Sequence, residues 1–194
     1  MDRRFFWVVT GILLVVVLAA AIALIVKRSG QTFNGSVINP ASPAADFSLT
    51  NQNDGTIRLS DYRGKYVLLF FGYSHCTNEC PATMAILAKA RSELGNQAEN
   101  VQVVFVATDP AGDTPQAMGT FLNRFDPTFM GATGTEAALQ PVWAAYGVTV
   151  LDGGDTHSSY VYLIDPKGNL RLTYAYPSTP EDIAADLKLL FRKG

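Results

Sequence analysis

The sequence predicts an α/β sandwich with a mixed central sheet, preceded by one transmembrane helix. Three observations lead to this prediction. Residues 5–26 carry no charge and are strongly apolar. Two short apolar runs, 66–71 and 103–107, have the continuous hydrophobicity of strands that are covered on both faces. A helical pattern lies between these two runs, and an antiparallel hairpin pattern follows at 159–174.

The N-terminal segment, residues 1–28, is predicted to be a membrane anchor. A helix over Phe5–Val26 rises about 1.5 Å per residue and is long enough to cross a hydrocarbon core of roughly 30 Å. A cleaved signal peptide is the alternative, because alanine-rich triplets at 19–23 resemble cleavage sites. The apolar run continues beyond these triplets, which favours the uncleaved anchor. Two basic residues flank each end, so the orientation rests on the N-terminal amine, which favours a cytoplasmic N-terminus.

Residues 29–45 are polar and contain Gly, Pro and Ser, so they are predicted to be a linker to a domain at 46–194. The net charge of the chain is −2, and its basic residues form no stripe. This distribution excludes a nucleic-acid-binding surface. The chain has 2 cysteines, which can form a single pair but not a disulfide scaffold.

The predicted elements of the domain alternate between strands and helices. In order, they are a hairpin at 47–59, a strand at 66–71, a helix at 81–94, a strand at 103–107, helices at 114–125 and 135–146, a hairpin at 159–174 and a helix from 179. Pro141 is expected to kink the helix at 135–146 or to delay its start. A thioredoxin-like fold is the simplest match to this order, with the cysteines at the end of the first central strand.

The stretch Gly72–Pro81 contains both cysteines at the junction of a strand and a helix. If this segment makes one turn, the Cα atoms of Cys76 and Cys80 lie about 6 Å apart, which permits either a disulfide or a shared metal ion. The N-terminus of the helix favours the thiolate form. The three intervening residues are one more than in thioredoxin-type reductants and suit a loop around an ion. Two thiolates with an imidazole match Cu(I).

The candidate imidazole is His157, which precedes the strand at 159–164 and reaches the cysteine end of the sheet if that strand runs antiparallel to the first. A structural disulfide and a hydrogen-bonded surface histidine are the alternatives, and residue chemistry leaves them open. His75 is expected to be a partly exposed loop residue. Asp109 is expected either to orient the site or to cap the turn at Pro110.

Three motifs in order extend this interpretation: Phe70–Pro81, Asp109–Pro115, and His157-Ser158 before a strand that ends in Asp165-Pro166. Together they resemble the SCO/SenC family of copper-binding, thioredoxin-like assembly factors. The similarity extends from about Phe33 to the C-terminus.

The resemblance implies that Cys76, Cys80 and His157 are copper ligands and that the two cysteines are also a redox-active pair. It implies copper delivery to the Cu(A) centre of cytochrome c oxidase, with its copper-bearing subunit or another copper carrier as partner. It also implies a single-pass protein of the cell membrane with an extracytoplasmic domain. The chain departs from the family pattern at Gly112, where Arg is usual, and at Thr156, where Asp is usual.

Two further functions are compatible with a thioredoxin-like fold. A thiol–disulfide oxidoreductase would use the same two cysteines to keep a partner's cysteines reduced. Thioredoxins, however, place a cis-proline opposite their cysteines, and residues 156–159 contain no proline. A peroxidase of the peroxiredoxin type would carry Thr or Ser three residues before its reactive cysteine, where this chain has Tyr73.

Overall fold

The computed structural model describes residues 11–19, 32–151, 156–157 and 159–193, and for residues 156, 157 and 193 it describes the backbone only. The chain divides into two compact units, residues 1–33 and 34–194. In the first unit, residues 11–19 are helical. No helix within the described residues has both the length and the hydrophobicity to cross a membrane. Most of the predicted span at 5–26 lies outside the described residues.

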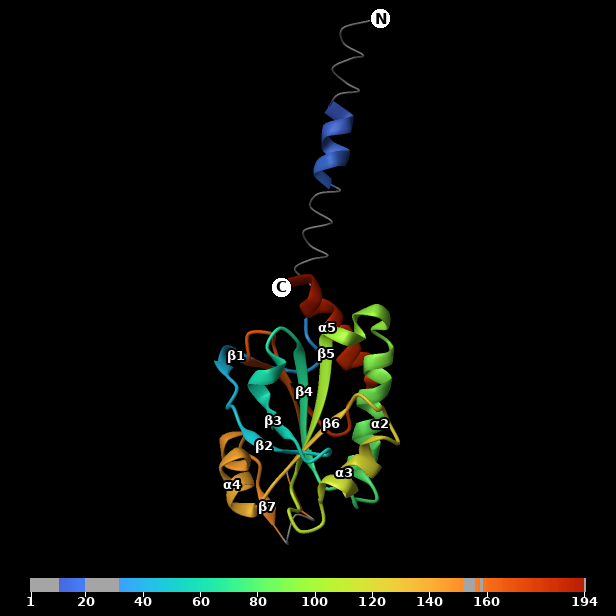
Figure 1. Cartoon of the computed structure of the whole chain (residues 1–194). Helices are drawn as coiled ribbons and strands as arrows, with labels where there is room; N and C mark the ends of the chain where they lie inside the picture. The colour runs from blue at the N-terminus through green and yellow to red at the C-terminus, as the bar shows by residue number, and fades with distance from the viewer. Residues whose placement is uncertain (1–10, 20–31, 152–155, 158, 194) are drawn as a thin grey trace, which may run out of the picture. The chain divides into compact units, whose positions relative to one another are not determined.

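The second unit is built on one mixed sheet (Figure 1). The sheet has eight strands in the spatial order β1-β10-β9-β4-β5-β6-β2-β3. In chain order these strands are β1 (Ser36–Pro43), β2 (Ser48–Asn51), β3 (Thr56–Arg58), β4 (Tyr66–Gly72), β5 (Val101–Ala107), β6 (Met130–Thr133), β9 (Tyr160–Ile164) and β10 (Asn169–Ala175). β4, β5 and β6 run parallel, whereas β9 runs antiparallel to β4 and to β10. A separate ribbon pairs β7 (Val150–Leu151) with β8 (Thr156–His157).

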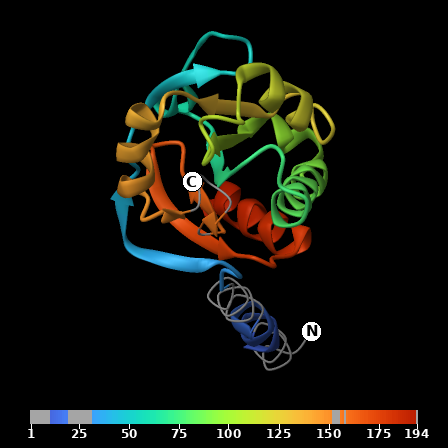
Figure 2. The ribbon, with the colours of Figure 1, turned by 90° about the horizontal axis from the view of Figure 1, so that it is seen from below.

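Helices cover both faces of this sheet. They are α2 (Glu79–Ser92), α3 (Pro115–Leu122), α4 (Glu136–Ala145) and α5 (Pro180–Lys193), with 3-10 segments η1 (Leu59–Tyr62) and η2 (Gly95–Asn100). α2 and α5 lie side by side on one face, and α4 lies on the opposite face (Figures 1 and 2). This arrangement confirms the predicted thioredoxin-like sandwich with a mixed sheet.

β4 lies at the centre of the core, and all seven of its residues are buried. Its side chains alternate between the two faces. The Phe70 ring packs against Phe105, 5.9 Å between centroids, on the face that carries α2. The Phe71 ring packs against Tyr146, 5.3 Å between centroids, at the end of α4. Burial on both faces explains the continuous apolar run in the sequence.

Several predicted elements are confirmed in detail. β2 and β3 form the first hairpin, β4–α2–β5 is a parallel crossover, and β9 and β10 form the second hairpin. Thr114 caps α3 as expected, because its side-chain oxygen accepts a hydrogen bond from Ala117 N at 3.2 Å. Pro141 lies inside α4 without delaying its start, since the helix already begins at Glu136.

Two predictions need correction. Ser36–Pro43, assigned to the linker, forms β1 and pairs with β10. An edge strand tolerates prolines, because one side of its backbone faces solvent. The helix after the cysteines begins at Glu79 and not at Pro81. A proline fits anywhere in a first turn, whose N–H groups have no partner within the helix. The short strand β6 was not predicted.

The start of the second unit is attached to α5 by a buried carboxylate. Asp186 is 1% exposed. It accepts hydrogen bonds from Gly35 N at 2.9 Å, from Asn34 N at 2.9 Å and from the Tyr174 hydroxyl at 3.0 Å. Because the donors come from the N-terminal segment and from β10, this one side chain joins three parts of the fold.

Candidate functional site

The cysteine turn begins where β4 ends, at its carboxyl end. Cys76 N donates a hydrogen bond to Tyr73 O at 3.3 Å, which closes a turn before α2. Cys80 is the second residue of α2 and is 0% exposed, whereas Cys76 is half-buried. Both cysteines are present as thiols. The predicted pair is therefore formed by one accessible and one buried sulfur.

Gly72 allows the buried sulfur to lie against the end of the strand. A Cβ atom at this position would be 2.8 Å from Cys80 Sγ and 2.9 Å from the Phe70 ring. Real Cβ atoms essentially never approach other atoms so closely. The glycine therefore provides the space that Cys80 Sγ occupies.

The two thiols differ in acidity. Desolvation by itself raises the pKa of Cys76, but hydrogen bonds from the backbone N–H groups of Asn78 and Cys80, and from the side chains of Cys80 and Tyr73, outweigh it. The pKa of Cys76 therefore lies below its usual value. Burial raises the pKa of Cys80 far above its usual value, and the nearby Cys76 sulfur adds to this effect. Cys76 is the more readily ionised thiol.

This difference predicts selective alkylation. Iodoacetamide at pH 8 is expected to modify Cys76 at least about tenfold faster than Cys80, because the thiolate is the nucleophile and only Cys76 is accessible. The rate at Cys76 should rise with pH and reach half of its maximum at a pH below the usual pKa of a cysteine. Peptide mass spectrometry over a pH series measures both rates. Equal rates at the two positions would contradict this assignment.

Asp113 holds the first part of the turn. Its side chain is 0% exposed, and its Oδ1 accepts a hydrogen bond from Ser74 N at 2.7 Å. Its Oδ2 has no hydrogen-bond partner among the described residues. Burial raises the pKa of Asp113, and the hydrogen bonds from Ser74 offset part of that rise.

His75 and Asp109 lie together beside the turn. The His75 side chain is 52% exposed, as expected for a loop residue, and its Nε2 lies 3.5 Å from Asp109 Oδ2. Asp109 Oδ1 also accepts a hydrogen bond from Ala111 N at 3.1 Å, so Asp109 caps the turn as well as contacting His75. A Cβ at Gly112 would overlap the Asp109 carboxylate and lie 2.9 Å from the His75 ring. An arginine at this position would therefore require the pair to move.

The backbone of His157 lies at the end of the sheet that the sequence predicted, which is the end that carries the cysteine turn. β9 runs antiparallel to β4, so the segment before β9 reaches the carboxyl end of β4. In that segment His157 pairs with Val150 in the β7–β8 ribbon. The His157 side chain lies outside the described residues. Among the side chains that are described, no group of three or more His, Cys, Asp or Glu is arranged to hold a metal ion.

A hydrogen bond that the sequence did not predict joins the cysteine turn to the histidine segment. Ser159 Oγ donates to Glu79 Oε2 at 2.6 Å, across 80 positions of the chain. Glu79 directly precedes Cys80, and Ser159 lies two positions after His157. Glu79 could have been noted from its place within the cysteine motif, but no sequence pattern indicates its partner.

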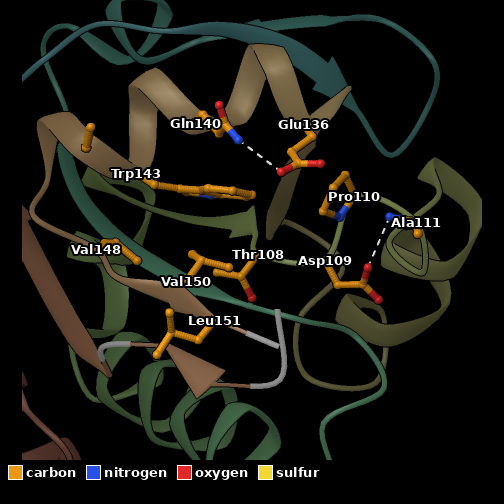
Figure 3. A pocket seen from close by; sticks show the side chains of 11 residues that line it. Thr108, Asp109, Pro110, Ala111, Glu136, Gln140, Trp143, Val148, Val150 and Leu151 are labelled. Carbon is orange, nitrogen blue, oxygen red and sulfur yellow. Dashed lines mark hydrogen bonds between the residues drawn. The ribbon is translucent and has the colours of Figure 1, made fainter. Parts of the chain in front are cut away.

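An open cavity of about 430 Å³ lies beside the site (Figure 3). Its walls come from the loop after β5, from α4 and from β7, and include Trp143, Val148 and Leu151. Leu151 is 53% exposed. The charged side chains in the lining are Asp109 and Glu136, both acidic. The cavity thus combines apolar walls with two acidic side chains, and it is lined by β7 and by Asp109, the residue that contacts His75.

Comparison with known proteins identifies the family. The family model described as SCO1/SenC matches residues 36–192. The chain belongs to the SCO1/SenC family. Among SCO relatives, the SCO2-like protein of Rickettsia felis is 30% identical over 152 residues, covering 74% of this chain and 74% of that protein. Mitochondrial SCO2 of Saccharomyces cerevisiae is 34% identical over 132 residues, covering 63% of this chain and 44% of that protein. This chain thus spans less than half the length of the yeast SCO relative.

Solved SCO structures share the fold. Arabidopsis thaliana ScoI with copper bound superposes with a TM-score of 0.72 at 25% identity, over 79% of this chain and 100% of that chain. Bradyrhizobium japonicum ScoI with copper bound gives a TM-score of 0.68 at 33% identity, over 76% of this chain and 98% of that chain. Apo Sco1 from Thermus thermophilus gives 0.73 at 31% identity, over 83% of this chain and 98% of that chain. The shared fold thus covers these three SCO chains almost entirely.

Proposed function

We propose that this chain is a membrane-anchored copper chaperone that binds copper through Cys76, Cys80 and His157 and assists assembly of the Cu(A) site of cytochrome c oxidase. The observation that carries the proposal is the pairing of a buried Cys80 sulfur with the Cys76 sulfur at the end of β4. Two SCO structures of this fold have copper bound. The backbone of His157 lies at the same end of the sheet as the two cysteines.

The acidities of the two thiols suit a soft cation. Each thiol loses its proton when its sulfur binds copper, so binding releases protons to solvent. Burial disfavours a bare thiolate at Cys80, and a cation bound to that sulfur compensates for the lost hydration. Two thiolates and a neutral imidazole form a donor set that binds Cu(I) in preference to harder divalent ions.

The proposed place of action is the extracytoplasmic face of the cell membrane, with residues 1–28 as a single-pass anchor. The recipient would be the copper-bearing oxidase subunit or another copper carrier, and both would be met at that membrane surface.

Metal binding by residues 32–194 tests the proposal, since the solved copper-bound SCO chains are covered to 98–100% by the fold that they share with this chain. The reduced protein should bind about one copper per chain. Its Cu(II) complex should show sulfur-to-copper charge transfer in absorption and a sulfur-ligated signal in EPR, whereas the Cu(I) complex has a filled d shell and gives no EPR signal. Cys76→Ser should remove these signals, and His157→Ala should weaken binding by about 10- to 100-fold. Thr77→Ala, at an exposed position between the cysteines, is the matched control. A Cys76→Ser variant that keeps the spectra would overturn the proposal.

A thiol–disulfide oxidoreductase is a second candidate, favoured by the lowered pKa of Cys76. The Cys76 thiolate would attack a partner disulfide and expel one partner thiolate. Cys80 would then lose its proton, attack the mixed disulfide at Cys76 and release the second partner thiolate. The chain would be left with a Cys76–Cys80 disulfide, and a dithiol reductant would have to restore it. A measured reduction potential more oxidising than that of the partner disulfide would exclude this role.

A further inference from the structure

We infer that Glu79 is a positioning residue for the proposed copper ligand His157, and that it acts through its hydrogen bond to Ser159. The inference rests on the proposed function, because His157 has a ligand's role only if copper is bound here. The observation behind it is the 2.6 Å contact between Ser159 Oγ and Glu79 Oε2. This contact connects the turn that carries both sulfurs to the segment that carries the imidazole.

The Glu79 end of this contact is fixed in place. Glu79 is the first residue of α2, and the adjacent Cys80 is completely buried against Gly72 and the Phe70 ring. A carboxylate at a helix N-terminus is also favoured by the helix dipole. The backbone of Glu79 is therefore held by the same packing that holds the Cys80 sulfur.

The Ser159 end lies between the ribbon and the sheet. Ser159 directly precedes β9, and its carbonyl oxygen accepts a hydrogen bond from Tyr176 N at 3.3 Å. On the other side of it, β8 contains only Thr156 and His157 and pairs only with β7 within the described chain. A two-stranded ribbon of this length has little stability of its own. The attachment at Ser159 is therefore the point where the histidine segment is tied to the cysteine turn.

The strength of the contact is sufficient for this role. A hydroxyl that donates to a carboxylate makes a charge-assisted bond, which is shorter and roughly twice as strong as a neutral one. Both side chains are half-buried, so water competes only partly for them. Loss of the bond would free the backbone at His157 to move relative to the two sulfurs. The cysteines themselves would stay in place.

The decisive experiment measures the effect of Glu79→Ala in two backgrounds. Cu(I) affinity is determined by competition with a chromophoric chelator, using residues 32–194 with and without His157→Ala. With His157 present, Glu79→Ala and Ser159→Ala should each weaken binding by about tenfold, the lower range for residues that orient a metal ligand. With His157→Ala, Glu79→Ala should cause no further loss, because the residue acts through that histidine. Glu79→Gln keeps an acceptor oxygen and should restore most of the affinity.

A second readout needs no copper. Amide hydrogen exchange at residues 157–161 should become faster in apo Glu79→Ala and Ser159→Ala, whereas exchange in the middle of α2 should not change. Glu93→Ala is the matched control, since Glu93 lies at the opposite end of α2 and contacts Lys89. It should alter neither affinity nor exchange.

Two results would overturn the inference. One is unchanged affinity in Glu79→Ala. The other is the same loss with and without His157, which would mean that Glu79 acts on the cysteines. Neither result affects the proposed function, which depends on the loss of copper in Cys76→Ser.

Discussion

Replacing Gly72 by Ala is expected to damage both the fold and the proposed copper site. The new Cβ would lie 2.8 Å from Cys80 Sγ, 2.9 Å from the Phe70 ring and 3.2 Å from the Phe105 ring. These rings are 1% and 0% exposed, so they have no free space to move into. Overpacking of this kind costs about 1–3 kcal/mol of unfolding free energy. Because the sulfur must move as well, Cu(I) affinity should fall by at least about tenfold.

Gly119→Ala is the matched control for this substitution. Gly119 lies inside α3, and an added Cβ would meet the Gln52 side chain at an ordinary 3.6 Å. Alanine in a helix interior is favoured over glycine by roughly 0.5–1 kcal/mol, so this variant should be slightly more stable and should bind copper normally. Denaturant titration and chelator competition give both quantities. A Gly72→Ala variant that behaves like Gly119→Ala would show that Cys80 Sγ does not depend on this space.

Replacing Asp186 by Ala is expected to be the most destabilising change outside the site. It leaves the buried Tyr174 hydroxyl and the N–H groups of Asn34 and Gly35 without their acceptor. Each unpaired buried group costs about 1–3 kcal/mol, and partial access of water to Asn34 reduces the total to roughly 3 kcal/mol. For a unit of this size, that loss lowers Tm by about 6–12 °C.

Glu181→Ala controls for the removal of an acid from α5, because Glu181 is exposed in the first turn of the same helix. Its Tm should match that of the wild type. Thermal unfolding followed by circular dichroism compares the two variants directly. If both variants melt together, the buried carboxylate does not secure the N-terminal segment.

The elements that the sequence predicted well are those whose pattern follows from burial or from local chemistry. β4 is apolar throughout because α2 and α4 cover its two faces, and α3 begins where Thr114 caps its first turn. β1 was missed because its pairing with β10 spans more than 120 positions of the chain, and its local composition resembles a loop. The start of α2 was misplaced because Pro81 fits the third position of a helix as well as the first.

The residues of the site also divide into those that a local sequence pattern reveals and those that depend on contacts between distant parts of the chain. Cys76 and Cys80 are recognisable from their spacing, and the position of the His157 backbone follows once β9 is known to run antiparallel to β4. The role of Gly72 depends on where the Cys80 sulfur lies in three dimensions. The partner of Glu79 depends on a contact across 80 positions. No local pattern encodes either relationship.

The central position of β9 determines when the site can form during synthesis of the chain. β9 lies between β4 and β10, yet it follows the cysteine turn by about 80 positions. A growing chain therefore cannot bring the histidine segment to the cysteine turn until residues as far as Ile164 are available to pair with β4. During that interval the cysteines can oxidise to a disulfide or bind a metal without the histidine segment. The proposed copper site can then reach its final geometry only late, after most of the domain has folded.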